Sequence, residues 1–185
     1  MQDSVLEKRV FVGAGSRDGD RMAMLGDGVR LLREQGVRAV RLSSIYETEP
    51  VGLEGAEPLL NGVLETDPDV PPGRLLEACL EAERRLGRQR RPGGPGAPDQ
   101  GLRPLDLDVL LYGPLVVERP GLTVPHPRLH QRRFVLVPLA EIAPEAWHPL
   151  LHASCATLLE LCPDSSWIRL HAPPSAWERA TASLK

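Results

Sequence analysis

The stretch Arg103-Pro104-Leu105-Asp106-Leu107-Asp108-Val109-Leu110-Leu111-Tyr112 combines a strand pattern with two acidic residues. Aliphatic side chains occupy every second position from Leu105 to Leu111, and Asp106 and Asp108 fall in the other register. This alternation predicts a β-strand whose two carboxylates point from one face, about 6.5 Å apart. Mg²⁺ favours one or two such carboxylates together with phosphate oxygens. Asp-x-Asp alone is a weak motif, because a strand with one solvated face carries the same residues.

The composition is that of an ordinary globular protein, with 42% hydrophobic and 25% charged residues in a chain of 185. We expect one domain spanning 1–185, with a loosely held tail at 1–8. The net charge of −3 argues against nucleic acid and anionic membranes as partners. The three cysteines lack metal-type spacing, and no signal peptide or long apolar run is present. We therefore expect a cytoplasmic protein with reduced thiols, Cys79 lying in the core.

Hydrophobic runs and the residues that end them predict the other elements. Strands are expected at 10–15, 37–46 and 59–65, helices through 24–32, from 71 or 72 to 86, at about 131–143 and at 154–161, and a hairpin at Gly113-Pro114. Segments 47–58 and 88–102 should be loops. The order β-α-β-β-α-β is that of an α+β sandwich, with helices packed on one face of a mainly antiparallel sheet.

Phosphate-binding loops built on lysine are excluded, because no lysine lies between residues 9 and 184. Gly13-x-Gly15 lacks the third glycine of a dinucleotide fingerprint, and we interpret it as a tight strand-to-helix turn. Positive charge comes from arginine instead. The Pro/Gly-rich segment 88–102 and its margins carry four such residues, whose guanidinium groups suit phosphate oxygens: Arg88, Arg90, Arg91 and Arg103. Loops this long inside compact domains are usually either functional lids or disordered. Taken alone, these arginines would indicate a solvated basic loop in an arginine-rich chain, and their place beside the two aspartates favours a mobile lid.

His126 and Glu83 each allow both a structural and a functional interpretation. His126 stands between Pro125 and Pro127, which restrict the backbone and fix where the imidazole points. A lone histidine is more often structural than functional. Glu83 falls seven residues after Leu76, on the apolar face of its helix, so it is either a buried acid or an acid at the rim of that face.

These segments together resemble one enzyme family. The run Ser43-Ser44-Ile45-Tyr46-Glu47-Thr48-Glu49-Pro50-Val51-Gly52, then Leu60-Asn61, Leu86-Gly87-Arg88, Arg103-Pro104-Leu105-Asp106-Leu107-Asp108, Thr123-Val124-Pro125-His126-Pro127 and Arg132-Arg133-Phe134 occur in order. From about residue 10 to 144 the chain is similar to 6-hydroxymethyl-7,8-dihydropterin pyrophosphokinase of the folate pathway. The resemblance implies a ferredoxin-like βαββαβ fold. It also implies transfer of a pyrophosphoryl group from ATP to the hydroxymethyl oxygen of the dihydropterin, leaving AMP.

The resemblance also implies roles for single residues. The metal ligands for two Mg²⁺ ions would be Asp106 and Asp108, which with Arg88 and Arg103 form the catalytic set. Contacts to ATP and its phosphates would come from Arg90, Thr123, His126 and Arg132. The pterin pocket would be lined by Thr48, Pro50, Val51, Asn61 and Phe134. Glu83 matches a family glutamate that supports the site, and the enzyme is expected to be a monomer.

Three departures from the family pattern concern the pterin and the lid. Leu59 stands where an aromatic residue usually precedes the pocket asparagine, and Arg17 stands where the first turn usually has asparagine. The segment 91–103 is longer than the usual lid and lacks its tryptophan. These changes bear on pterin affinity and on lid closure, and leave the acidic pair intact.

Two other classes remain as alternatives. A different two-metal enzyme, such as a nucleotide hydrolase, could use the same Asp-x-Asp. A non-catalytic ferredoxin-like module could bind RNA through the basic loop, but such a module needs sheet-face aromatics on which bases stack. Only 4% of residues are aromatic, and the net charge is negative, so we rank the pyrophosphokinase above both.

Overall fold

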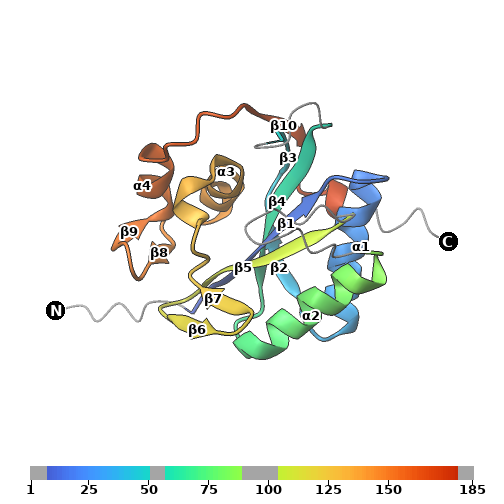
Figure 1. Ribbon diagram of the computed structural model, residues 1–185, viewed down its shortest axis with the longest axis horizontal. Helices are drawn as coiled ribbons and strands as arrows, with labels where there is room; N and C mark the ends of the chain where they lie inside the picture. The colour runs from blue at the N-terminus through green and yellow to red at the C-terminus, as the bar shows by residue number, and fades with distance from the viewer. Residues whose placement is uncertain (1–7, 51–56, 89–103, 179–185) are drawn as a thin grey trace, which may run out of the picture.

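The computed structural model describes residues 8–50, 57–88 and 104–178 (Figure 1). Its centre is a six-stranded sheet in the order β10-β3-β4-β1-β5, with β2 also paired to β4, and all of these pairings are antiparallel. The strands are β1 (Val10–Ser16), β2 (Ala39–Leu42), β3 (Ile45–Thr48), β4 (Leu59–Thr66), β5 (Asp106–Tyr112) and β10 (Ile168–Ala172). The central strand β1 therefore lies between β4 and the acidic strand β5.

Alternation along β1 divides the core into two clusters. Val10, Val12 and Ala14 pack toward α1 (Arg21–Glu34) and α2 (Pro72–Arg85), which lie together on one face. Phe11 packs on the other face, toward α3 (Arg133–Ile142) and α4 (Cys155–Glu160). Figure 1 shows the two helix pairs on opposite sides of the sheet.

The predicted ferredoxin-like βαββαβ class is confirmed. Its two helices, α1 and α2, share one face as expected, and α3 and α4 cover part of the opposite face as an addition to that core. The Asp20 side chain accepts a hydrogen bond of 3.0 Å from the Ala23 N–H, so it is the N-cap of α1. Pro72 opens α2, and Cys79 on that helix is fully buried, as predicted.

Two predictions of local structure were wrong. The strand expected at 37–46 breaks at Ser43, whose N–H donates to the Val63 carbonyl while its Oγ accepts from the Val63 N–H, both at 2.9 Å. Two strands result, and β3 continues to Thr48, into the segment expected as a loop. The hairpin forms later than expected: β6 (Val117–Arg119) pairs with β7 (Leu122–Val124), and Gly113-Pro114 only precedes it.

The C-terminal part holds more structure than its sequence pattern indicates. The helix expected at 131–143 is a 3-10 turn, η1 (Leu129–Gln131), followed by α3, and α4 fills the helix expected at 154–161. The pair β8 (Trp147–His148) and β9 (Ala153–Ser154) precedes α4, and β10 was not predicted at all.

The tail at 1–7 and segment 89–102 of the predicted lid lie outside the described residues, as do Val51, Arg90 and Arg103. Within the ranges that are described, no helix is both long and apolar enough to cross a bilayer.

Candidate active site

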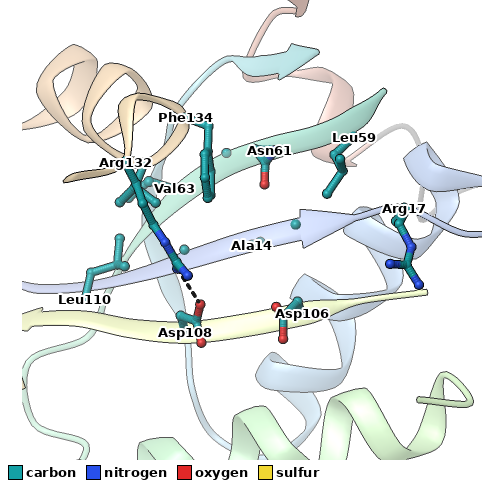
Figure 2. A pocket seen from close by; sticks show the side chains of 14 residues that line it. Ala14, Arg17, Leu59, Asn61, Val63, Asp106, Asp108, Leu110, Arg132 and Phe134 are labelled. Atoms are coloured by element: carbon teal, nitrogen blue, oxygen red, sulfur yellow. Dashed lines mark ion pairs between the residues drawn. The ribbon is translucent and has the colours of Figure 1, made fainter. Parts of the chain in front are cut away.

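A pocket of about 200 Å³ opens on the face of the sheet that α3 only partly covers (Figure 2). Its floor comes from three neighbouring strands. Gly15 on β1 pairs with Asn61 on one side and Asp106 on the other, and Gly13 likewise lies between Val63 and Asp108. Side chains of β4 and β5 therefore face each other across a strand that has none at these two positions.

The glycine pair lies inside β1, so its interpretation as a strand-to-helix turn was wrong. The two glycines matter because they have no side chain and so leave the floor of the pocket open. A Cβ on residue 15 would lie 2.8 Å from the Asn61 Oδ1, and one on residue 13 would lie 3.4 Å from the Leu110 methyl carbons. Any larger residue at position 15 would displace the Asn61 amide or fill the space beside it.

Asp106 and Asp108 point into this pocket from alternate positions of β5, as the alternation predicted (Figure 2). Their side chains keep 30% and 43% of their surface exposed. The Asp106 Oδ1 lies 2.6 Å from the Arg88 Nη1. The Asp108 Oδ2 lies 3.7 Å from the Arg132 Nη1. Each carboxylate thus has a guanidinium beside it and still faces the pocket.

Behind Asp106 lies a buried acid. The Glu83 side chain is 2% exposed, forms an ion pair with Arg88, and accepts a 2.7 Å hydrogen bond from the Leu107 N–H. Burial raises the pKa of the Glu83 carboxyl above its ordinary value, while the Leu107 N–H and the Arg88 charge act in the opposite direction. Glu83 is therefore a buried acid and not a rim residue. It fixes both the backbone of β5 and the guanidinium that reaches Asp106.

His126 is held in one orientation. Its backbone N–H donates to the Leu110 carbonyl at 2.9 Å, and its ring Nδ1 accepts from the backbone N–H of Arg128 at 3.2 Å. Burial, followed by the charges of Arg132 and Arg128, lowers the pKa of His126 to about 4, so the ring is neutral near pH 7. With Nδ1 as the acceptor, the proton sits on Nε2, which lies 3.9 Å from the Asp108 Oδ2.

The opposite wall contains an amide and a ring, and the amide is hydrogen-bonded to a buried hydroxyl. The Asn61 Nδ2 donates to the Thr48 Oγ1 at 2.7 Å, and both side chains are buried. Phe134 and Leu59 stand on either side of Asn61 above the floor (Figure 2). The Arg132 guanidinium lies 5.5 Å from the centroid of the Phe134 ring, in cation–π range. Arg17 lines the pocket where β1 ends.

The structure brings together most, but not all, of the residues singled out in the sequence. The predicted residues that line the pocket are Asn61, Asp106, Asp108, Arg132 and Phe134. Arg88, His126 and Thr48 do not line it but lie beside Asp106, Asp108 and Asn61, respectively. Thr123, which is exposed on β7, and Pro50, which follows β3, are also not among the lining side chains. Wall residues that the sequence analysis did not single out are Val63, Leu110 and Val135. Val63 and Leu110 continue the alternation of Asn61 and of Asp108. That signal becomes useful only once the strands that pair are known.

The sequence model of 7,8-dihydro-6-hydroxymethylpterin-pyrophosphokinase, abbreviated HPPK, matches residues 11–144. The chain belongs to this family. An HPPK relative from Methylorubrum extorquens is 42% identical over 139 residues, 74% of this chain and 84% of its own length. One from Porphyromonas gingivalis is 38% identical over 142 residues, 76% of this chain and 93% of its own. Both are named 2-amino-4-hydroxy-6-hydroxymethyldihydropteridine pyrophosphokinase.

Other relatives are much longer than this chain. Folic acid synthesis protein fol1 of Schizosaccharomyces pombe is 33% identical over 171 residues, which are 92% of this chain but 22% of that protein. Among solved structures, wild-type Plasmodium falciparum HPPK-DHPS with pteroate superposes with a TM-score of 0.58 at 12% identity. The superposition covers 83% of this chain and 44% of the Plasmodium falciparum chain. At this identity, the similarity concerns the fold alone.

Proposed function

We propose that the protein is a pyrophosphokinase, which transfers the terminal diphosphate of ATP to the hydroxymethyl oxygen of 6-hydroxymethyl-7,8-dihydropterin and releases AMP. Membership of the HPPK family supports the reaction. Within this chain, the proposal depends on the pairing of β4 and β5 on either side of β1. Two carboxylates on β5 face an amide and a ring from β4 and α3 across a floor of glycine. A donor polyphosphate and a flat acceptor can therefore meet in one pocket.

The acidic pair fits two Mg²⁺ ions. Both carboxylates offer hard oxygen atoms to the same pocket, and among the described residues no third His, Cys, Asp or Glu completes a cluster. Such a set suits a metal that takes its remaining ligands from water and phosphate. When bound, Mg²⁺ would neutralise phosphate charge and acidify the attacking hydroxyl. Asp106 and Asp108 would hold the two ions. Asp108 would also orient the Nε2–H of His126 and the guanidinium of Arg132 on the nucleotide side.

The arginine residues supply charge that persists when water leaves the site. Arg88 is fixed by Glu83 and Asp106, so it is positioned before substrate arrives. Such preorganised charge acts on the transferred group without a reorganisation cost. We propose the same clamping role for Arg90 and Arg103, and nucleotide contacts for Thr123, from the resemblance to the family.

The acceptor side supplies recognition. The Asn61 side chain keeps its Oδ1 above the floor at Gly15, where it can accept from the edge of a heterocycle, while Thr48 holds the amide in place. Phe134 offers a ring face on which a flat pterin can stack. Pro50 and Val51 would complete the rim of this side.

One incubation distinguishes this proposal from a nucleotide hydrolase. The protein is supplied with Mg-ATP, with and without the dihydropterin alcohol, and the products are separated by chromatography. We expect AMP and pterin diphosphate to form in equal amounts, and only when the pterin is present. Release of ADP and phosphate at the same rate with and without pterin would instead support the hydrolase.

Leu59→Tyr should tighten pterin binding by severalfold, up to about tenfold. The leucine packs against a ring without the additional 0.5–1.5 kcal/mol, approximately, that an aromatic pair contributes. ATP affinity should hardly change, because Leu59 lies across β1 from the acidic strand. Calorimetric titration of each ligand measures both effects. Leu150→Tyr, on an exposed turn residue, is the matched control, and weaker pterin binding in Leu59→Tyr would count against the assigned pterin wall.

We also propose that the protein acts as a cytoplasmic monomer, without nucleic acid or a membrane. The net charge of −3 supports the lack of polyanionic partners. Sedimentation velocity across a hundredfold concentration range tests the monomer, because a dimer would appear as a concentration-dependent increase in the sedimentation coefficient.

A further inference from the structure

The C-terminal segment beyond the family match returns to the pterin side of the pocket. The match ends at residue 144, and the described chain continues through α4 and β10 to residue 178. β10 lies beside β3, as Figure 1 shows, and the chain then turns so that Trp177 enters the core shared with α1 and α2. The segment thus reaches the sheet twice, both times near Thr48 and Asn61.

Trp177 packs against the back of the strand that carries Asn61. The indole is 1% exposed, and it fits against Gly62 so closely that a Cβ there would collide with its Cζ2. Because side chains alternate along a strand, Gly62 faces the core while Asn61 and Val63 face the pocket. The ring therefore supports β4 directly behind the acceptor wall.

A hydrogen bond extends this support to the break between β2 and β3. The Trp177 Nε1 donates to the Ser43 carbonyl at 2.8 Å. Ser43 in turn exchanges two hydrogen bonds of 2.9 Å with Val63, one through its N–H and one through its Oγ. The indole thus fixes the point where β3 starts, relative to β4.

β10 holds the other end of β3. Ile168 pairs with Thr48, and the Glu49 N–H donates to the Trp167 carbonyl at 3.2 Å. Arg169 forms an ion pair with Glu47 on the same strand. Without β10, the four residues of β3 would have a single neighbouring strand, and short edge strands open easily.

We propose that Trp177, with β10, is a positioning element for the Thr48–Asn61 pair, so that the C-terminal segment sets the affinity for the pterin and not for ATP. The inference rests on the proposed function. The nucleotide side, with Asp108, His126 and Arg132, belongs to β5 and to the chain before α3, across β1 from this contact. If the Trp177 indole lost its contacts, the Asn61 amide, which we propose binds the edge of the pterin, would shift, while the nucleotide-side groups would stay in place.

Three variants of the full chain test the inference. Trp177→Ala removes both the packing and the hydrogen bond, and Trp177→Phe keeps a ring but loses the donor to Ser43. Leu75→Ala is the matched control, because Leu75 is fully buried in the same core cluster on α2 and has no part in this contact. Calorimetry measures the Kd of the dihydropterin alcohol with a non-hydrolysable ATP analogue present, and the Kd of the analogue alone.

We expect the pterin Kd to rise about fivefold to twentyfold in Trp177→Ala, and less in Trp177→Phe, with the analogue Kd within about twofold of wild type. Leu75→Ala should leave both constants unchanged despite a comparable loss of stability. An unchanged pterin Kd in Trp177→Ala, or an equal rise in Leu75→Ala, would overturn the inference.

Hydrogen exchange without any ligand separates this inference from the proposed function. Backbone amides of 43–48 and 61–63 should exchange faster in Trp177→Ala than in Leu75→Ala, because the contact that fixes β3 to β4 is gone. Wild-type protein that fails to bind the pterin would count against the function, while this exchange difference would still support the positioning. Equal exchange in the two variants would contradict the positioning even if the wild-type protein is an active pyrophosphokinase.

Discussion

Asp108→Ala should abolish turnover, lowering kcat by at least about 10³-fold, while the protein remains folded. The side chain is 43% exposed and lies outside both hydrophobic clusters, so its removal leaves no core cavity. Its loss would remove a proposed metal ligand and the partner of both His126 and Arg132. AMP formation under saturating Mg-ATP and pterin measures the effect, and circular dichroism and thermal melting report the fold.

Asp106→Ala should have a similar effect on kcat but is a less simple variant, because Asp106 also binds Arg88. Arg88 retains its ion pair with Glu83, so we expect the fold to survive in this variant too. Asp69→Ala, at an exposed position in the turn before α2, serves as the control and should turn over at the wild-type rate. Near wild-type activity in either pocket variant would refute the assignment of the two carboxylates as metal ligands.

Much of the fold could be predicted because its signals are local. The alternation in β5 and the start of α2 at Pro71 or Pro72 each depend on residues within one strand or one helical turn. The break between β2 and β3 could not be found in this way. It depends on hydrogen bonds between Ser43 and Val63, twenty residues later. β10 has little hydrophobic pattern of its own, since Leu170 is exposed, and exists because β3 offers an edge.

The residues of the candidate site show the same difference between local signals and tertiary contacts. Its acidic pair is visible in the sequence because both members lie on one strand. The glycine pair was misread as a turn, because the reason for its small size is the Asn61 amide on a strand about fifty residues away. Helical periodicity alone allowed two interpretations of Glu83, a buried acid or an acid at the rim of the apolar face. The contact with Arg88 and the Leu107 N–H, which only tertiary structure supplies, decides between them.

Glu83→Ala should destabilise the protein by about 3–5 kcal/mol, the usual range for breaking a buried ion pair from one side. The variant leaves the Leu107 N–H without its acceptor and the largely buried Arg88 with the charge of Asp106 alone. A loss of this size is a large fraction of the roughly 5–15 kcal/mol that holds a typical domain folded. Urea denaturation, followed by fluorescence and circular dichroism, gives the free energy of unfolding.

Glu81→Ala is the matched control for Glu83→Ala, because the two residues lie two positions apart on α2 and each pairs with an arginine. The Glu81 side chain keeps 39% of its surface exposed and its partner is Arg84, so its removal should leave the free energy of unfolding nearly unchanged. Glu83→Gln should fall between the two, since its amide oxygen still accepts from Leu107 but the charge facing Arg88 is lost. Equal stability of the Glu81 and Glu83 alanine variants would mean that Arg88 and β5 find other partners, and that the buried acid does not hold the site together.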